Sequence, residues 1–369
     1  MTDRERFAAV MSYQPFDRVP AWYFGYWRET LERWLAEGLE GAGQVAVASG
    51  MDPDWEEGMW NIHGLLNVSA IPARPNRIIE EADTYRVVRT GLGALVKESK
   101  RGSSIPTHLE HALKPTREDW KRFKTMMDPA DASRYTPDWQ SKVAAINART
   151  RVGCFLGGSL YACPREWMGV EELSYLMYDD PVLLEEILEH LVDFWMTLMR
   201  PVLAKVRFDF AYFFEDCCFN TGPLVSPDLY RKYFDKYYRR LIEFYRSMGV
   251  PFMLMDSDGK VDALIDCWLE SGFDIVFPIE VGTWKADPAA LRRQYGKRLR
   301  MMGGVDKHVI PRGEAAIRKH LEPLRPLVAE GGFVPLPDHR IPPHCSWDQW
   351  RTYVRVFKEV LASWAGPQP

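Results

Sequence analysis

Several features that would assign this chain to a common class are missing from its sequence. No apolar run approaches the roughly 18 residues of a membrane-spanning helix, and the charged N-terminus, MTDRERFAAVMSYQPFDR, has no apolar signal-peptide segment. The formal net charge of -4 provides no broad field to attract nucleic acid or an anionic membrane. The six cysteines form no CxxC pair and no regular framework, so we expect reduced thiols and a cytoplasmic protein.

The composition that remains is that of a globular protein with a large core. The chain has 369 residues, of which 46% are hydrophobic and 27% are charged. A rule of about 150 residues per domain would give two domains, but α/β barrels often exceed that length as one unit. We therefore expect one domain over residues 1–369, with an N-terminal elaboration and the first strands up to about residue 150.

Residues 151–369 contain a regular strand-then-helix repeat. Short apolar runs end in glycine or a carboxylate, and a helical pattern follows each of them. The expected strands are 152–156, 208–214, 252–255, 275–278, 299–302 and 333–336, and the expected helices are 164–177, 181–205, 227–248, 261–269, 313–330 and 347–363. Strict alternation of this kind predicts a parallel sheet.

The N-terminal part is less regular. A helix capped by Thr2 or Asp3 is expected up to about Met11, and a first strand is expected at 19–24. A helical stretch at 29–37, a hairpin around a glycine turn at 85–99 and a second helical stretch at 115–150 follow. An eighth strand between residues 41 and 77 would close the sheet. No strand is followed by a GxGxxG turn, which argues against an open doubly wound sheet. We therefore predict an α/β fold, a single (β/α)8 TIM-type barrel with an N-terminal helical and hairpin elaboration.

In such a barrel the carboxyl ends of the strands meet at one mouth, where active sites lie. The polar and small residues expected there are Tyr26, Arg28, Gly158, Ser159, Glu215, Asp216, Asp256, Asp258, Glu280, Asp306, Asp338 and His339. Burying so many unpaired carboxylates would cost several kcal/mol each unless a metal, a cation or a substrate compensates. The alternative for any single acid is a helix cap, as for Asp258 before Gly259 or Asp306 before Lys307.

Other residues at the mouth could have either a functional or a purely structural role. His339 follows Asp338 and would lie opposite Asp256, so we interpret it as functional rather than merely hydrogen-bonded. Cys217 and Cys218 could be thiolate ligands or small buried fillers. Aromatic residues of the N-terminal half could form a pocket for a flat apolar ligand, although most belong in the core: Trp22, Tyr23, Tyr26, Trp27, Trp55, Trp60, Tyr161 and Trp167.

Over nearly its whole length the chain resembles the uroporphyrinogen decarboxylase superfamily, which includes corrinoid-dependent methyltransferases. The motifs are RERFAAV at 4–10, FDRVP at 16–20, ED at 215–216, SPDLY at 226–230, DSDG at 256–259, PIE at 278–280, YGKRL at 295–299, GGVDK at 303–307, PDH at 337–339 and PP at 342–343. The resemblance implies a TIM-type barrel and is much less specific for an activity.

Two departures count against decarboxylation of a porphyrinogen. The decarboxylases of the superfamily have an Arg-rich segment after the first proline, which binds substrate carboxylates, and an aspartate in a Phe-Ser-Asp stretch. Here residues 21–28 contain one arginine, and no Phe-Ser-Asp occurs. A substrate with several carboxylates requires several cations.

The thiol-methylating relatives bind zinc through a His-x-Cys pair before a glycine, plus a cysteine at the last strand. The resemblance places Asp256, Asp258 and His339 at these positions. Two carboxylates and an imidazole could hold zinc or a harder divalent ion. They would not form the sulfur-rich site that activates a thiol, so the resemblance implies a substrate other than coenzyme M or homocysteine.

Three functions stay open: a methyltransferase for a methoxylated or methylamine-like compound, a lyase that decarboxylates a porphyrinogen or a smaller aromatic acid, and a catalytically silent binding barrel. The expected partners are a small-molecule substrate and a separate protein that supplies a corrinoid (cobalamin), with a homodimer left open. We predict Asp256, His339 and Glu215 as catalytic residues and Asp256, Asp258 and His339 as metal ligands. The predicted substrate-binding residues are Tyr26, Arg28, Trp167, Asp216, Glu280 and Asp306.

Overall fold

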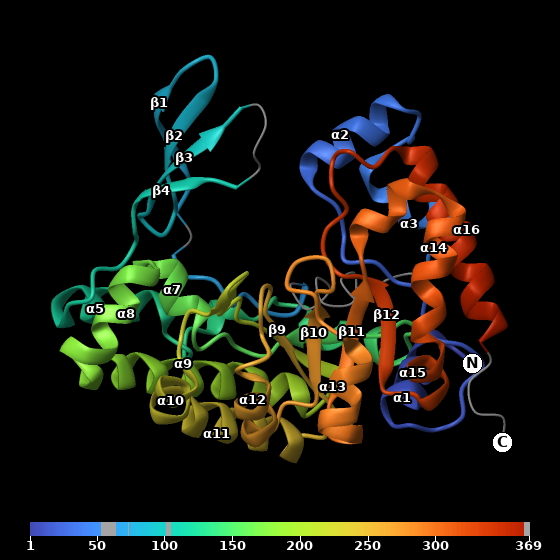
Figure 1. Cartoon of the computed structure of the whole chain (residues 1–369). Helices are drawn as coiled ribbons and strands as arrows, with labels where there is room; N and C mark the ends of the chain where they lie inside the picture. Colours follow the sequence, from blue (N-terminus) through green and yellow to red (C-terminus); the bar gives the residue numbers. More distant parts are fainter. Residues whose placement is uncertain (53–63, 73, 101–104, 365–369) are drawn as a thin grey trace.

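The centre of the structure, which is a computed structural model, is a parallel β-sheet (Figure 1). Residues 1–52, 64–72, 74–100 and 105–364 are described. The sheet strands are β5 Cys154–Leu156, β6 Phe210–Phe214, β9 Met253–Asp256, β10 Ile275–Ile279, β11 Arg300–Val305 and β12 Phe333–Pro337. They lie in the order β12-β11-β10-β9-β6-β5, and every neighbouring pair is parallel, which confirms the sheet predicted from the alternating pattern.

Helices connect these strands and leave little of the sheet in contact with solvent. Every residue of β9, β10 and β12 is buried, which is typical of parallel strands covered on both faces. The α-helices are α1 Asp3–Met11, α2 Arg28–Ala36, α3 Val45–Ser49, α5 Arg117–Lys124, α6 Trp139–Asn147, α7 Ala162–Met168, α8 Val170–Asp179, α9 Pro181–Leu203, α10 Pro227–Leu229, α11 Asp235–Ser247, α12 Ile265–Ser271, α13 Pro288–Tyr295, α14 Glu314–Leu321, α15 Arg325–Glu330 and α16 Trp347–Ser363. Among the described helices, none has a stretch that is both long and apolar enough to cross a membrane.

Local sequence signals explain where several helices begin and change. Thr2 caps α1 and Ser346 caps α16, each in a reciprocal capping box, so the Thr2 cap expected from the sequence is confirmed. The single helix expected over 227–248 is instead divided, because a π-helical turn, Tyr230–Phe234, separates α10 from α11.

The prediction of a first strand at residues 19–24 is wrong. This stretch is buried but is not part of a strand, and Ala21 within it pairs with Asp52. Pro20 has no N–H to donate, while the Ala21 N–H donates to the Asp52 carboxylate at 2.9 Å and the Ala21 carbonyl accepts from the Asp52 N–H at 3.1 Å. Just beyond this stretch, Tyr26 forms an isolated parallel bridge with Ile341, which follows β12.

Closure of the sheet is not seen among the described residues. Between residues 41 and 77 they form a short 3-10 helix, Ala42–Gln44, the helix α3, and one antiparallel bridge from Leu66 to Tyr135. The expected eighth strand falls partly on residues 53–63, which lie outside the described residues. In the part of the chain that is described, β5 and β12 are therefore the two edges of the sheet.

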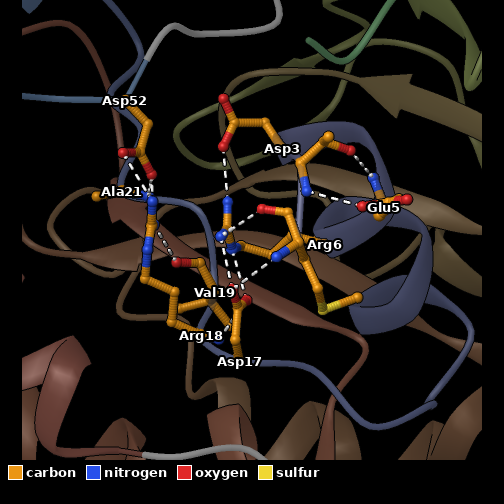
Figure 2. Close-up of polar contacts among 10 residues, drawn as sticks. Asp3, Glu5, Arg6, Asp17, Arg18, Val19, Ala21 and Asp52 are labelled. Carbon is orange, nitrogen blue, oxygen red and sulfur yellow. Dashed lines mark hydrogen bonds and ion pairs between the residues drawn. The ribbon is translucent and has the colours of Figure 1, made fainter. Parts of the chain in front are cut away.

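A network of ion pairs ties helix α1, the segment around Asp17 and Arg18, and Asp52 together (Figure 2). The buried Arg6 guanidinium donates to Asp17 through two nitrogens, each at 2.8 Å, and to Asp3 at 2.6 Å. These bonds to Arg6 hold the pKa of Asp17 well below its usual range. Arg18 forms a two-pronged contact with Asp52, the same carboxylate that binds the Ala21 N–H. Side-chain charges thus contribute to holding the segment around Ala21 in place.

A second sheet projects from the body of the molecule (Figure 1). Its antiparallel strands are β1 Arg77–Glu81, β2 Tyr85–Arg89, β3 Leu95–Ser99 and β4 Thr107–Glu110, in that order. The predicted hairpin is confirmed as β2 and β3. A small cluster of Val88, Ala94 and Val96 is its own core, and all residues of β1 and β4 are exposed.

Candidate active site

The parallel sheet brings the carboxyl ends of its strands together at one end of the sheet, as the alternating sequence predicted. Glu215 and Asp216 follow β6, Asp256 ends β9, and Asp258 lies two residues beyond it. The ends of β10, β11 and β12 are followed by Glu280, Asp306, and Asp338 with His339. Most of these side chains form hydrogen bonds with different groups, and only some of them contact one another.

Three of them form a cluster, made of Asp258, Glu280 and His339. One ligand atom from each residue lies within 4.8 Å of the others, and His339 Nε2 is 3.1 Å from Asp258 Oδ2. We call this set the carboxylate–imidazole cluster. Two of its members, Asp258 and His339, were predicted metal ligands, whereas Glu280 was predicted to bind substrate.

The donor atoms of the carboxylate–imidazole cluster fit a divalent metal ion. Glu280 is almost fully buried, and burial, together with the neighbouring Asp258, raises the pKa of its carboxyl group. Asp258 Oδ1 and His339 Nδ1 are buried and have no hydrogen-bond partner among the described residues. Carboxylate and imidazole ligands suit zinc and harder divalent ions, and a cation would balance the two crowded acids.

Asp256, predicted as both a catalytic residue and a metal ligand, is not a member of this cluster. Its side chain is buried, and its Oδ2 atom accepts a hydrogen bond from the Tyr212 hydroxyl of β6. Tyr212 was not among the predicted site residues. The signal for it was the adjacent strand, because a residue of β6 that faces the same side of the sheet as Asp256 lies within reach of it.

Glu215 caps a helix. Its carboxylate accepts hydrogen bonds from the backbone N–H groups of Leu160, Tyr161 and Ala162, at 2.8–2.9 Å, just where α7 begins. Burial raises the pKa of Glu215 to about 7, although these N–H groups act in the opposite direction. Its oxygens are already used by the backbone, so its predicted catalytic role stays a prediction.

Asp216 is paired with an arginine that the sequence analysis did not identify. The Arg165 guanidinium of α7 contacts Asp216 Oδ2 at 2.8 Å and also binds the Asp216 carbonyl. Burial nevertheless raises the pKa of Asp216. The residue has a φ of 40°, so the backbone turns sharply directly after β6.

The acids that follow β11 and β12 hold nearby loops. Asp306 accepts from the His308 N–H at 2.8 Å, as the helix-cap alternative expected. Asp338 is fully buried and accepts from the N–H groups of Lys307 and Gly282 at 3.0 and 2.7 Å. A Cβ atom on Gly282 would lie only 2.9 Å from Asp306 Oδ1, so a larger residue here would displace that carboxylate.

The predicted aromatic and arginine contacts are dispersed. The Tyr26 hydroxyl donates to the Ala42 carbonyl at 3.1 Å, and Arg28 forms an exposed ion pair with Glu32 at 3.5 Å. Trp167 is buried against Phe123, away from the cluster, and lines a separate cavity.

Aromatic groups do surround His339, but they are different ones. Its ring lies 5.4 Å from the Phe24 ring and 5.6 Å from the Trp27 ring, measured between centroids. The Arg340 guanidinium lies over both of those aromatic rings. Trp27 was among the aromatic residues considered for a pocket, whereas Phe24 and Arg340 were not predicted to belong to the site. The available signal for Arg340 was its position next to His339 at a strand end.

The fold and the acidic residues at its strand ends define a parallel α/β protein with a candidate metal or proton-transfer site at the carboxyl ends of its strands. The family model for uroporphyrinogen decarboxylase (URO-D) matches residues 87–360, well over half of the sequence. The chain belongs to this family.

The chain is also similar to solved structures. A methyltransferase from Methanosarcina mazei aligns over 98% of this chain and 99% of its own, with a TM-score of 0.56 and 14% sequence identity, which shows a shared fold. A B12-independent methionine synthase from a Shewanella species, in complex with selenomethionine, aligns over 94% and 95% with a TM-score of 0.37 and 14% identity. A sequence comparison with curated proteins gave no match.

Proposed function

We propose that this protein is a methyltransferase that moves a methyl group between a methoxylated or methylamine-like compound and a corrinoid protein. The observation that carries the proposal is the carboxylate–imidazole cluster of Asp258, Glu280 and His339. Family membership and the fold shared with a methyltransferase support it. The proposal includes a single domain over residues 1–369 in which the N-terminal segment completes a (β/α)8 barrel.

The reaction makes one chemical demand on this chain. When the bond from the methyl carbon to oxygen or nitrogen breaks, its electron pair stays on the leaving atom, which must be neutralised. A divalent ion held by the cluster would supply Lewis-acid polarisation of that atom. In the metal-free version of the site, Glu280 would instead be the chain's own candidate proton donor, since burial raises the pKa of its carboxyl group.

Other residues would shape this site. The Phe24 and Trp27 rings lie against His339 and would exclude water beside it. Tyr212 orients Asp256 by donating a hydrogen bond from its hydroxyl group to Oδ2. Asp256 would thus act on substrate or on a proton rather than on the metal.

The alternative is a lyase that decarboxylates a porphyrinogen or a smaller aromatic acid. It is favoured by the name of the matching family and by Arg340, a cation beside His339 that could hold a carboxylate. In that case Asp256 or His339 would supply the proton to carbon.

Metal content separates the two functions and the two proposed ligand sets. We expect wild-type protein, incubated with Zn²⁺ and desalted, to retain one ion per chain by elemental mass spectrometry. Asp258→Asn, Glu280→Gln and His339→Ala should each weaken retention by at least about 100-fold, because each removes a ligand. His308→Ala, which removes an exposed imidazole, is the matched control.

Asp256→Asn is the decisive variant in this set. The cluster geometry predicts that it keeps the ion, whereas the ligand set inferred from the sequence predicts that it loses the ion. Asp256→Asn should keep the fold but lose turnover. Turnover is measured with cob(I)alamin as methyl acceptor and 4-methoxybenzoate or trimethylamine as methyl donor. Wild-type protein that retains no ion would overturn the metal version and return these acids to proton transfer, as the lyase requires.

A further inference from the structure

A separate cavity lies between the projecting sheet and the body of the molecule. Its volume is about 490 Å³, within the range of small-molecule sites. One wall is formed by Leu156 at the end of β5, by Trp167 of α7, and by Leu191 and Trp195 of α9. No member of the carboxylate–imidazole cluster is among the described residues that line it.

The opposite wall is built by the β2–β3 turn and the segment before β1. The Gly91 N–H of the turn donates to Asn76 Oδ1 at 2.9 Å. The contact is so close that a Cβ atom on Gly91 would lie 2.2 Å from the Arg74 carbonyl oxygen. The turn and the segment are therefore packed as one wall, with Thr90 and Leu92 on the cavity side.

The lining is apolar with one positive charge. Trp167 and Trp195 are both more than nine-tenths buried and provide flat indole surfaces. Arg74 is the one charged residue among the described lining residues, and its exposed guanidinium forms no ion pair with any described residue. Burial raises the pKa of the Cys163 thiol to about 12, so this lining residue stays neutral.

One polar group in the lining lacks a partner. The Thr90 hydroxyl is buried and makes no hydrogen bond within the described part of the chain. A buried hydroxyl without a partner costs free energy, and a rotation of the Thr90 side chain that brings it to a ligand oxygen would remove that cost. Thr90 and Arg74 are both on the wall opposite the two indoles.

We propose that this cavity binds a planar aromatic carboxylate. The aromatic ring would lie against Trp167 and Trp195, and the carboxylate would pair with Arg74 and accept from Thr90. Arginine suits this role because its planar donors match a carboxylate. The proposal does not rest on methyl transfer, because it concerns binding alone.

The test is isothermal titration of the full chain with 2-naphthoate and with 2-naphthamide, its neutral isostere, with no metal added. We expect one site per chain for naphthoate and about tenfold weaker binding of the amide, because a charge-assisted contact is lost. Arg74→Gln should bring naphthoate down to the affinity of the amide. Thr90→Val should weaken naphthoate severalfold.

Arg77→Gln is the matched control, since it removes an exposed arginine on β1 that does not line the cavity. It should bind like wild type. Equal affinities for naphthoate and the amide, equal effects of Arg74→Gln and Arg77→Gln, or no binding of either probe would each overturn the proposal. Because no metal is present, these outcomes leave the metal test of the proposed function unaffected.

Discussion

Glu215 and Glu280 are both buried carboxyl groups at strand ends, but their neighbours give them different tasks. Glu215 accepts three backbone N–H groups at the start of α7. Glu280 accepts one, from Gly259 at 2.9 Å, and faces Asp258 and His339. Glu215 therefore stabilises a loop, whereas Glu280 retains free lone pairs for a ligand or a proton.

The pKa of Glu215 leads to a prediction about stability. Burial raises this pKa from 4.5 to about 7, so the folded protein holds the proton more tightly than the unfolded chain. The free energy of unfolding should fall as the pH rises through this range, by on the order of 3 kcal/mol. Glu215→Gln stays neutral and should lack this component of the pH dependence.

Urea unfolding of both proteins at pH 5 and pH 8 measures the effect. Between pH 5 and pH 8, wild type should lose roughly 2–3 kcal/mol of unfolding free energy relative to Glu215→Gln, because the neutral amide of the variant does not ionise. Parallel pH profiles would show that the pKa of this carboxyl group is not raised in the folded state.

At the same scale, the sequence identified the acids at the strand ends but not which of them meet. Asp256 and Asp258 are equivalent in a spacing argument, since both follow an apolar run. In the structure Asp256 still belongs to β9 and faces Tyr212, while Asp258 lies in the following loop and reaches His339. Which way a loop turns depends on its tertiary neighbours, and no periodicity encodes that.

At the scale of elements, the close approach of β10 and β11 depends on a glycine. Gly303 has a φ of 121°, and a Cβ atom there would lie 2.5 Å from the Ile279 backbone nitrogen. Gly249, between α11 and β9, has a φ of 86° and nothing within 4 Å of such an atom. The two positions share a positive φ and differ in the space around them.

We expect Gly249→Ala to cost about 1 kcal/mol from backbone strain alone. Gly303→Ala should cost roughly 2–3 kcal/mol more, because backbone atoms of β10 would have to move. The free energy of unfolding of the two variants, measured by urea denaturation, checks this. Similar losses would mean that the sheet accommodates the added methyl group.

Helices were predictable because burial of one face leaves a period in the sequence, and inner strands because burial of both faces leaves a continuous apolar run. The stretch 19–24 shows the limit of that signal. Its residues are as buried as those of a strand, yet Ala21 pairs with Asp52 and not with a neighbouring strand. An apolar pattern reports burial, whereas ladder hydrogen bonds depend on a partner that is distant in the sequence.

At the scale of the whole molecule, the two sheets should differ in local stability. The parallel sheet lies inside the main core, while the projecting sheet buries only a small cluster around Val88 and Val96. Local opening free energies follow the amount of buried apolar contact.

Hydrogen exchange measured by mass spectrometry tests this difference. Amides of β2 and β3 should exchange at least about 100-fold faster than those of β9 and β10. Equal protection of the two sheets would show that they unfold together as one cooperative unit.

The irregular register of β1 has a consequence for how copies of this chain behave when crowded. An outermost strand with unpaired backbone groups is a template on which other chains can add strands and aggregate. In β1 the pairing with β2 shifts between Ile78 and Glu80, and charged side chains, Arg77, Glu80 and Glu81, lie on either side of two exposed isoleucines. A register shift and charges of this kind oppose edge-to-edge growth, so the β1 edge of the projecting sheet is a poor template for added strands.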